Sequence, residues 1–198
     1  MLVGVPKVFL ETPDWEEKHI RISLKDTEIE KCPDIQHHLP VSRKYEQELY
    51  KHYRTNPYWP TANIGLGGGF YPPRPLQIPN SEVSEEKIGT ILRSFREVDG
   101  YQIHATDGQI GHLADLVVDD EDWQIVYGIV DTRNWMPWSK KVMIPLDAME
   151  KISFERREVY IRLMIETIKN GPEYNPGESI SEAYEQGVYD FFSSSLVK

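Results

Sequence analysis

The fold is decided by the stretch GYQIHATDGQIGHLADLVVD, residues 100–119. Tyr101, Ile103 and Ala105 alternate with polar residues, and this period of two is typical of a β-strand with one buried face. Asp107-Gly108 follows directly, and glycine accepts the positive φ that a tight hairpin turn demands. The stretch therefore predicts a β-hairpin.

Further strands are expected downstream of this hairpin. Leu116–Val118 runs into an acidic turn at 119–123, and residues 124–131 are rich in β-branched and apolar side chains, so a second hairpin is the simplest interpretation. The segment 141–145 ends at a proline, which cannot donate to a ladder, and residues 158–163 alternate cleanly. Several short strands separated by turns, with little helix between them, indicate a mainly β fold, a small antiparallel β-barrel rather than a βαβ sheet.

The chain also repeats itself. A shift of 139 positions lays Trp15 on Phe154 and continues without a gap, and such self-similarity indicates a duplicated unit. Nothing ahead of Trp15 corresponds to the strand-rich stretch 92–135, so the first copy is expected to be truncated. The same shift matches Ile22 with Ile161, Leu24 with Leu163, Pro33 with Pro172, Ser42 with Ser181 and Tyr45 with Tyr184.

Each copy is expected to close with a short C-terminal helix. Apolar and aromatic residues recur at helical spacing in 184–192 and in 45–53, each time after a serine able to cap the helix. Between the copies, prolines and a Gly67–Gly69 run cannot propagate a helix or a central strand. We therefore expect three segments: a truncated repeat with its tail helix at 1–55, a Pro/Gly-rich linker at 56–90, and a complete barrel with its tail helix at 91–198.

Four segments of the chain resemble the PRC-barrel family. They are the hairpin stretch, the Asp-Asp-Glu-Asp-Trp turn at 119–123, the Tyr-Gly-Ile-Val-Asp-Thr-Arg-Asn-Trp run and the Ile-Lys-Asn-Gly-Pro-Glu-Tyr-Asn-Pro segment. That family includes the cytoplasmic part of the photosynthetic reaction-centre H subunit and the C-terminal domain of a ribosome maturation factor. The resemblance covers residues 92–175 fully and 9–36 as the last part of a second barrel. It implies a small β-barrel that docks to other proteins, in a family without known shared catalytic residues.

Two departures narrow the resemblance. The chain has no N-terminal membrane helix of the kind an H subunit carries, and its second module is a partial copy of the same unit rather than the different N-terminal barrel of a ribosome maturation factor. The chain therefore resembles the free-standing tandem type.

Composition excludes several classes of function. A net charge of −10 repels phosphate backbones, so nucleic acid is not expected as a partner. No apolar run approaches the roughly 20 residues of a membrane helix, and no secretory signal is recognisable, so we expect a cytoplasmic protein without a transmembrane segment. Cys32 is the only cysteine, which excludes an intrachain disulfide and Cys-rich zinc sites.

The chemical signals favour a protein with no cofactor, no metal site and no catalytic residues. The acidic run 119–122 could attract calcium, but the alternating carboxylates of a calcium loop are absent, and a solvated hairpin turn is the preferred interpretation. His37-His38 and His52 could bind a transition metal, but adjacent histidines in a strand point in opposite directions. General acid–base catalysis requires two titratable groups whose pKa values are driven apart by their surroundings. The matched carboxylates Glu16/Glu155 and Glu46/Glu185 offer no recognisable pair of this kind.

Trp135 and Trp138 are the candidate partner contacts. They lie in one loop, with Met136 and Pro137 between them. Such a loop either folds back as a lid over the barrel or presents a flat apolar surface to a partner.

A truncated barrel leaves strand edges open. Strands in 3–10 and 19–24 would expose unpaired backbone groups, which the complete barrel, the same fragment of a second chain, or a different protein could cover. The second option predicts a homodimer about a two-fold axis, with residues 1–53 forming much of the contact. Another explanation of the truncated first copy is that residue 1 is not the natural start of the protein.

These expectations favour a non-catalytic docking or adaptor protein whose protein partner the sequence does not name. One alternative is an accessory reaction-centre H-subunit-like protein, which modulates photosynthetic electron and proton transfer in peripheral contact with a membrane complex. A third hypothesis, a metal-dependent enzyme, predicts stoichiometric metal after purification.

Overall fold

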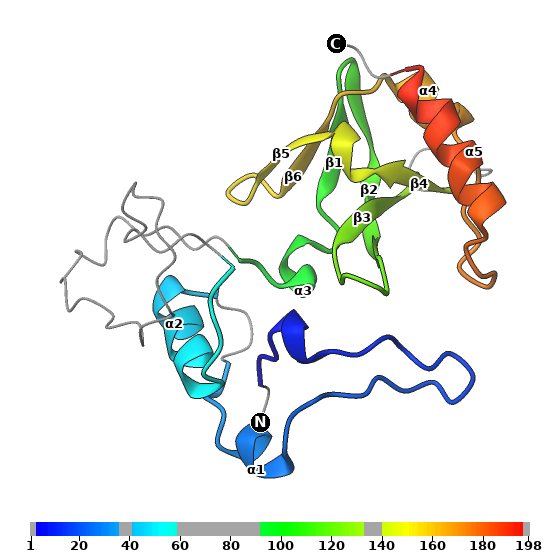
Figure 1. The fold of residues 1–198 in the computed structure, drawn as a ribbon. Helices are drawn as coiled ribbons and strands as arrows, with labels where there is room; N and C mark the ends of the chain where they lie inside the picture. Colours follow the sequence, from blue (N-terminus) through cyan, green and yellow to red (C-terminus); the bar gives the residue numbers. More distant parts are fainter. Residues whose placement is uncertain (1–2, 36–40, 59–91, 133–139, 196–198) are drawn as a thin grey trace, which may run out of the picture. The chain divides into compact units, whose positions relative to one another are not determined.

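The computed structural model describes residues 3–35, 41–58, 92–132 and 140–195, which form two units (Figure 1). The first unit comprises Met1–Leu10 and Ile22–Arg93, and the second comprises Glu11–Arg21 and Ser94–Lys198. Two separate clusters of buried apolar residues are present, a large one in the second unit and a small one in the first.

The second unit is built on a six-stranded mixed sheet. Its strand order is β4-β3-β2-β1-β6-β5, and the pairs are antiparallel except for β1 and β6, which run parallel (Figure 1). The strands are β1 (Gln102–Ala105), β2 (Gly108–Val118), β3 (Ile125–Asp131), β4 (Lys141–Pro145), β5 (Met149–Ser153) and β6 (Glu158–Ile161).

The predicted hairpin is confirmed. Ala105 at the end of β1 pairs with Gly108 at the start of β2, so the chain reverses between them. The second predicted hairpin is also confirmed: β2 continues to Val118, and after the acidic turn β3 returns antiparallel to it, with Val118 opposite Ile125. β5 was not predicted at all, since only Met149 and Ile152 are apolar in its five residues.

The expectation of an antiparallel barrel needs correction. The sheet is mixed, and within the described residues it is open, with β4 and β5 as its two edges. The edge strands nevertheless follow each other in the chain, joined by the 3-10 turn η3 (Leu146–Ala148). The sheet therefore curls, and the end of Met149 in β5 lies against Gly128 of β3. Pro145 ends β4 because it has no N–H to extend the ladder.

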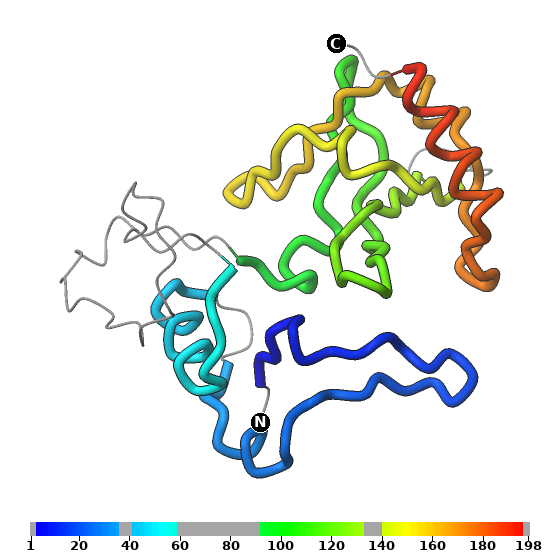
Figure 2. Tube along the Cα trace, viewed as in Figure 1, coloured from blue at the N-terminus to red at the C-terminus, as the bar shows by residue number. Residues whose placement is uncertain are grey.

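Helices cover one side of this sheet. The predicted tail helix is confirmed as α5 (Glu182–Ser193), and the Ser181 hydroxyl caps it by accepting from the Tyr184 N–H. Its residues Val188 and Phe192 are fully buried in the main core, and α5 lies beside β4 (Figure 2). Two shorter helices, α3 (Phe95–Val98) and α4 (Ile165–Asn170), complete the unit.

The first unit has a smaller core. Its helices are α1 (Asp26–Glu30) and the predicted tail helix α2 (Arg43–His52), preceded by the 3-10 turn η1 (Lys7–Phe9). The Ser42 hydroxyl caps α2 by accepting from the Tyr45 N–H, as Ser181 does for α5. The core is formed by Cys32, Leu49 and Tyr53, with Val3, Phe9, Leu24 and Tyr45 packed around them.

Backbone features of residues 3–54 recur 139 positions later. η1 and η3, α1 and α4, and α2 and α5 begin at matched residues. Lys18 and Arg157, also matched, both adopt a positive φ, of 54° and 58°. The bridges Val3–Asp34, Leu10–Ile22 and Asp14–His19 correspond to Val142–Glu173, Met149–Ile161 and Ser153–Glu158.

Candidate functional site

The first candidate site is the hairpin formed by residues 9–24. The expectation of strands in 3–10 and 19–24 was wrong, because residues 7–9 form the 3-10 turn η1 and the two arms of the hairpin are joined by isolated bridges. The N–H of Glu11 donates to the Arg21 carbonyl at 3.0 Å, and the N–H of Ser23 donates to the Phe9 carbonyl at 2.9 Å. Asp14 and His19 exchange two such bonds near the turn. Figure 2 shows the chain doubling back on itself through this segment. The hairpin matches the β5–β6 pair of the second unit.

The two hairpins differ in exposure. Val159 and Ile161 on β6 are 0% and 2% exposed, whereas their counterparts Ile20 and Ile22 are 47% and 38% exposed. Trp15, which matches the half-buried Phe154, is 70% exposed. β6 has β1 on its other edge, whereas within the described residues no backbone group pairs with the outer edge of the 9–24 hairpin at Ile20 and Ile22. The hairpin therefore presents apolar side chains of the kind that form the core in the second unit.

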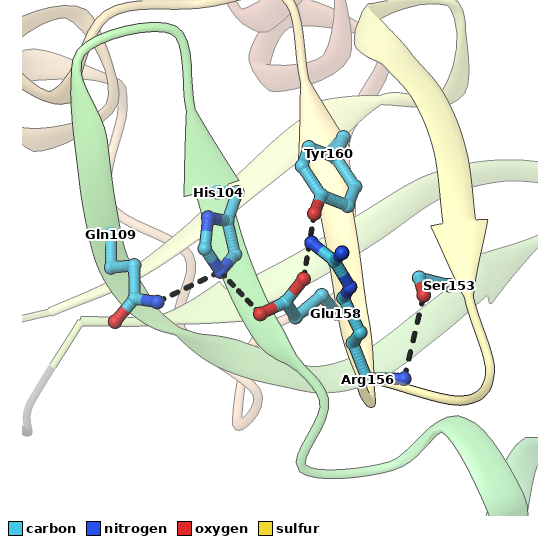
Figure 3. Close-up of polar contacts among 6 residues, drawn as sticks. All are labelled: His104, Gln109, Ser153, Arg156, Glu158 and Tyr160. Carbon is cyan, nitrogen blue, oxygen red and sulfur yellow. Dashed lines mark hydrogen bonds and ion pairs between the residues drawn. The ribbon is translucent and has the colours of Figure 1, made fainter.

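The second candidate site is a polar cluster on β1 and β6 (Figure 3). The His104 Nε2 lies 3.0 Å from a carboxylate oxygen of Glu158, and the Tyr160 hydroxyl donates to the other oxygen at 2.7 Å. The His104 and Tyr160 rings stack at 5.0 Å, and the Lys151 ammonium lies 4.5 Å from the centre of the Tyr160 ring. The parallel pairing of β1 with β6 places His104 opposite Tyr160.

The His104 ring has two alternative polar partners. Its Nε2 is also 2.9 Å from the Gln109 side-chain nitrogen. When Nε2 carries a hydrogen it donates to Glu158, and when it carries none it accepts from the Gln109 amide. The partner of His104 Nε2 therefore depends on the tautomer of the ring.

The charges of this cluster are coupled. The hydrogen bond from Tyr160 holds the pKa of Glu158 below its ordinary value, and His104 and Arg156 act in the same direction. The same hydrogen bond to Glu158 raises the pKa of Tyr160. The cluster therefore favours an ionised Glu158 beside a neutral tyrosine.

This coupling predicts a pH dependence of folding. Because the folded-state pKa of Glu158 is depressed, its stabilising effect is present above the ordinary glutamate value of 4.5 and is lost as the pH falls through the depressed pKa. We expect Glu158→Gln to reduce the loss of stability between about pH 5 and pH 3. Urea unfolding midpoints across this range measure the effect. Glu155→Gln, in the exposed turn nearby, is the matched control, and parallel curves for wild type and Glu158→Gln would contradict the prediction.

Sequence reasoning missed this cluster. His104 and Tyr160 stand at polar positions of two predicted strands, which was the available signal. Their meeting depends on the parallel β1–β6 pairing, between strands more than 50 positions apart, and no local pattern encodes that pairing.

The predicted partner contacts, Trp135 and Trp138, lie outside the described residues, as do His37-His38 and Gly67–Gly69. The acidic run forms the turn between β2 and β3, where one Asp119 carboxylate oxygen accepts from the N–H groups of Glu121 and Asp122. Over the described ranges, no three His, Cys, Asp or Glu side chains are grouped so that they could hold a metal ion.

The matched glutamates Glu46 and Glu185 occupy different surroundings. Glu46 is buried in α2 and pairs with Arg43 at 3.1 Å, and its burial raises its pKa although Arg43 opposes the shift. Glu185 is exposed on α5 and accepts from the Tyr127 hydroxyl at 2.8 Å. Burial, followed by this hydrogen bond, raises the pKa of Tyr127. The two glutamates therefore act as local structural partners in the described parts of each unit.

No protein-family model matches the chain, and no curated protein matches it. Within the described residues, the protein contains no helix with the length and hydropathy required to cross a bilayer.

Proposed function

We propose that the chain is a non-catalytic docking protein, and that the hairpin of residues 9–24 forms much of its binding surface. The observation that carries the proposal is the exposure of Ile20 and Ile22, whose counterparts Val159 and Ile161 are core residues. Clustered apolar side chains on a protein surface are typical of sites that bind other proteins.

We further propose that residues 91–198 form a PRC-type barrel module, that residues 1–55 are a partial copy of it, and that residues 56–90 link them. The recurrence of three backbone bridges, of a positive φ in the hairpin turn and of two serine-capped helices at a spacing of 139 supports this organisation. The resemblance of the strand and turn sequences to the PRC-barrel family supports the same conclusion.

The double substitution Ile20→Ser with Ile22→Ser tests the docking proposal. We expect it to abolish capture of partner proteins from extracts of the native cell, measured by quantitative mass spectrometry on immobilised full-length chain. Because both side chains are exposed, the free energy of unfolding should change by less than about 1 kcal/mol.

Ile180→Ser is the matched control, since Ile180 is 37% exposed and lies outside the hairpin. This control should capture the same proteins as the wild type. Equal capture by the wild type, the control and the double variant would contradict the proposal.

We also propose that the protein forms a homodimer to which residues 1–53 contribute. Light scattering at micromolar concentration should then report twice the chain mass of 23.1 kDa. A mass equal to that of one chain would contradict the dimer. It would not affect the docking proposal, which the capture experiment tests separately.

A further inference from the structure

We infer that the outer edge of the hairpin arm at residues 18–24 binds an acidic, extended strand of a partner protein, which adds to the hairpin in the parallel direction. The inference rests on the docking function proposed above and specifies its geometry and its chemistry. Strand addition of this kind obtains affinity from backbone hydrogen bonds and specificity from alternate side chains.

The hydrogen bonds of the hairpin identify its open edge. His19, Arg21 and Ser23 direct their backbone groups to the neighbouring strand of the hairpin. Because successive residues of a strand point their backbone groups to opposite edges, the N–H and C=O of Ile20 and Ile22 face outward. Within the described ranges no backbone group pairs with them.

The second unit contains a template for a strand added at this edge. There β6 pairs with β5 on one edge and with β1, in parallel, on the other. β1 places Ile103 opposite Val159, the counterpart of Ile20. The N–H of Gln102 donates to the carbonyl of Arg157, the residue that matches Lys18. By this template the incoming strand runs parallel to 18–24 and presents an apolar side chain opposite Ile20.

Charge indicates the chemistry of the partner strand. Although the net charge of the protein is −10, residues 18–25 contain Lys18, Arg21, Lys25 and His19 and no acidic residue. Arg21 matches Tyr160, which stands opposite His104 in the template, so a carboxylate at that position of the incoming strand would pair with Arg21. Pairing this edge with a second copy of itself would bring two sets of cations together, so the homodimer proposed above would use other surfaces of residues 1–53.

Two peptides test the inference. Each copies residues 100–107, one with the substitution His104→Glu and the other with His104→Lys. In NMR spectra of the full-length chain, we expect the H104E peptide to shift the amide signals of Ile20 and Ile22 and to slow their hydrogen exchange. The H104K peptide should bind at least about threefold more weakly than the H104E peptide, because it lacks the exposed ion pair with Arg21.

The variant Arg21→Glu should reverse this preference. It places a carboxylate on the hairpin where the wild type has a guanidinium, and leaves the outward N–H groups unchanged. A wild-type chain that binds neither peptide, or an Arg21→Glu variant that keeps the wild-type preference, would overturn the inference.

Ile20→Pro tests the backbone contribution. It removes an outward N–H that the hairpin itself does not use, so peptide binding should fall by at least about tenfold. Thr12→Pro, on the other strand of the hairpin, is the matched control and should bind as the wild type does. Where Ile20→Pro fails to fold, Ile20→Ser keeps the N–H but loses the apolar contact, and unchanged binding by Ile20→Ser would count against the inference.

Failure of this inference can be separated from failure of the docking proposal. If both peptides fail while capture from the extract still depends on Ile20 and Ile22, strand addition is wrong and docking stands. Peptide-induced shifts confined to residues outside 18–24 would also overturn strand addition at this edge.

Discussion

Gly111→Ala should destabilise the second unit by about 3–5 kcal/mol, because it combines backbone strain with overlap. Gly111 adopts a φ of +61° within β2, a conformation that residues with a Cβ rarely accept. A Cβ at this position would overlap the backbone carbonyl of Asp131 on the neighbouring strand β3. Since a domain of this size has a total stability of about 5–15 kcal/mol, much of the folded population could be lost. Urea unfolding followed by circular dichroism measures the change.

Gly187→Ala is the matched control for this substitution. Gly187 lies within α5, and a Cβ there would meet no other atom within 4 Å. Alanine favours a helix over glycine by up to about 1 kcal/mol, so this variant should be slightly more stable than the wild type. If the free energy of unfolding of Gly111→Ala lies within about 0.5 kcal/mol of the wild-type value, β2 and β3 do not approach each other closely at this position.

Phe192→Ala is expected to cost about 3–5 kcal/mol, the range for removing a large aromatic side chain from a core. Phe192 is fully buried, its ring lies 5.0 Å from that of Phe191, and its tip lies close to Gly171. Removing the ring would leave a cavity between α5 and the sheet. The free energy of unfolding, from urea or guanidinium titration, measures the loss.

Tyr189→Ala provides the comparison within the same helix. Tyr189 is 55% exposed, so its removal should cost less than about 1 kcal/mol. Equal costs for the two substitutions would mean that α5 does not bury the face that the aromatic spacing predicts.

Local features of this protein could be predicted from its sequence. The β1–β2 hairpin follows from alternation and an Asp-Gly turn, and the helices α2 and α5 follow from a capping serine and apolar residues at helical spacing. All three depend on interactions between residues close together in the chain. The side-chain matches at a spacing of 139 positions were likewise visible in the sequence.

The contacts between distant segments were decided only by the tertiary structure. The parallel pairing of β1 with β6 brings His104, Glu158 and Tyr160 together, and no local pattern specifies it. Likewise, the sequence places similar apolar residues at Ile22 and Ile161, but only the presence of β1 beside β6 buries one and leaves the other exposed. Burial depends on which strand occupies the neighbouring edge, and that is a property of the assembled sheet rather than of any single strand.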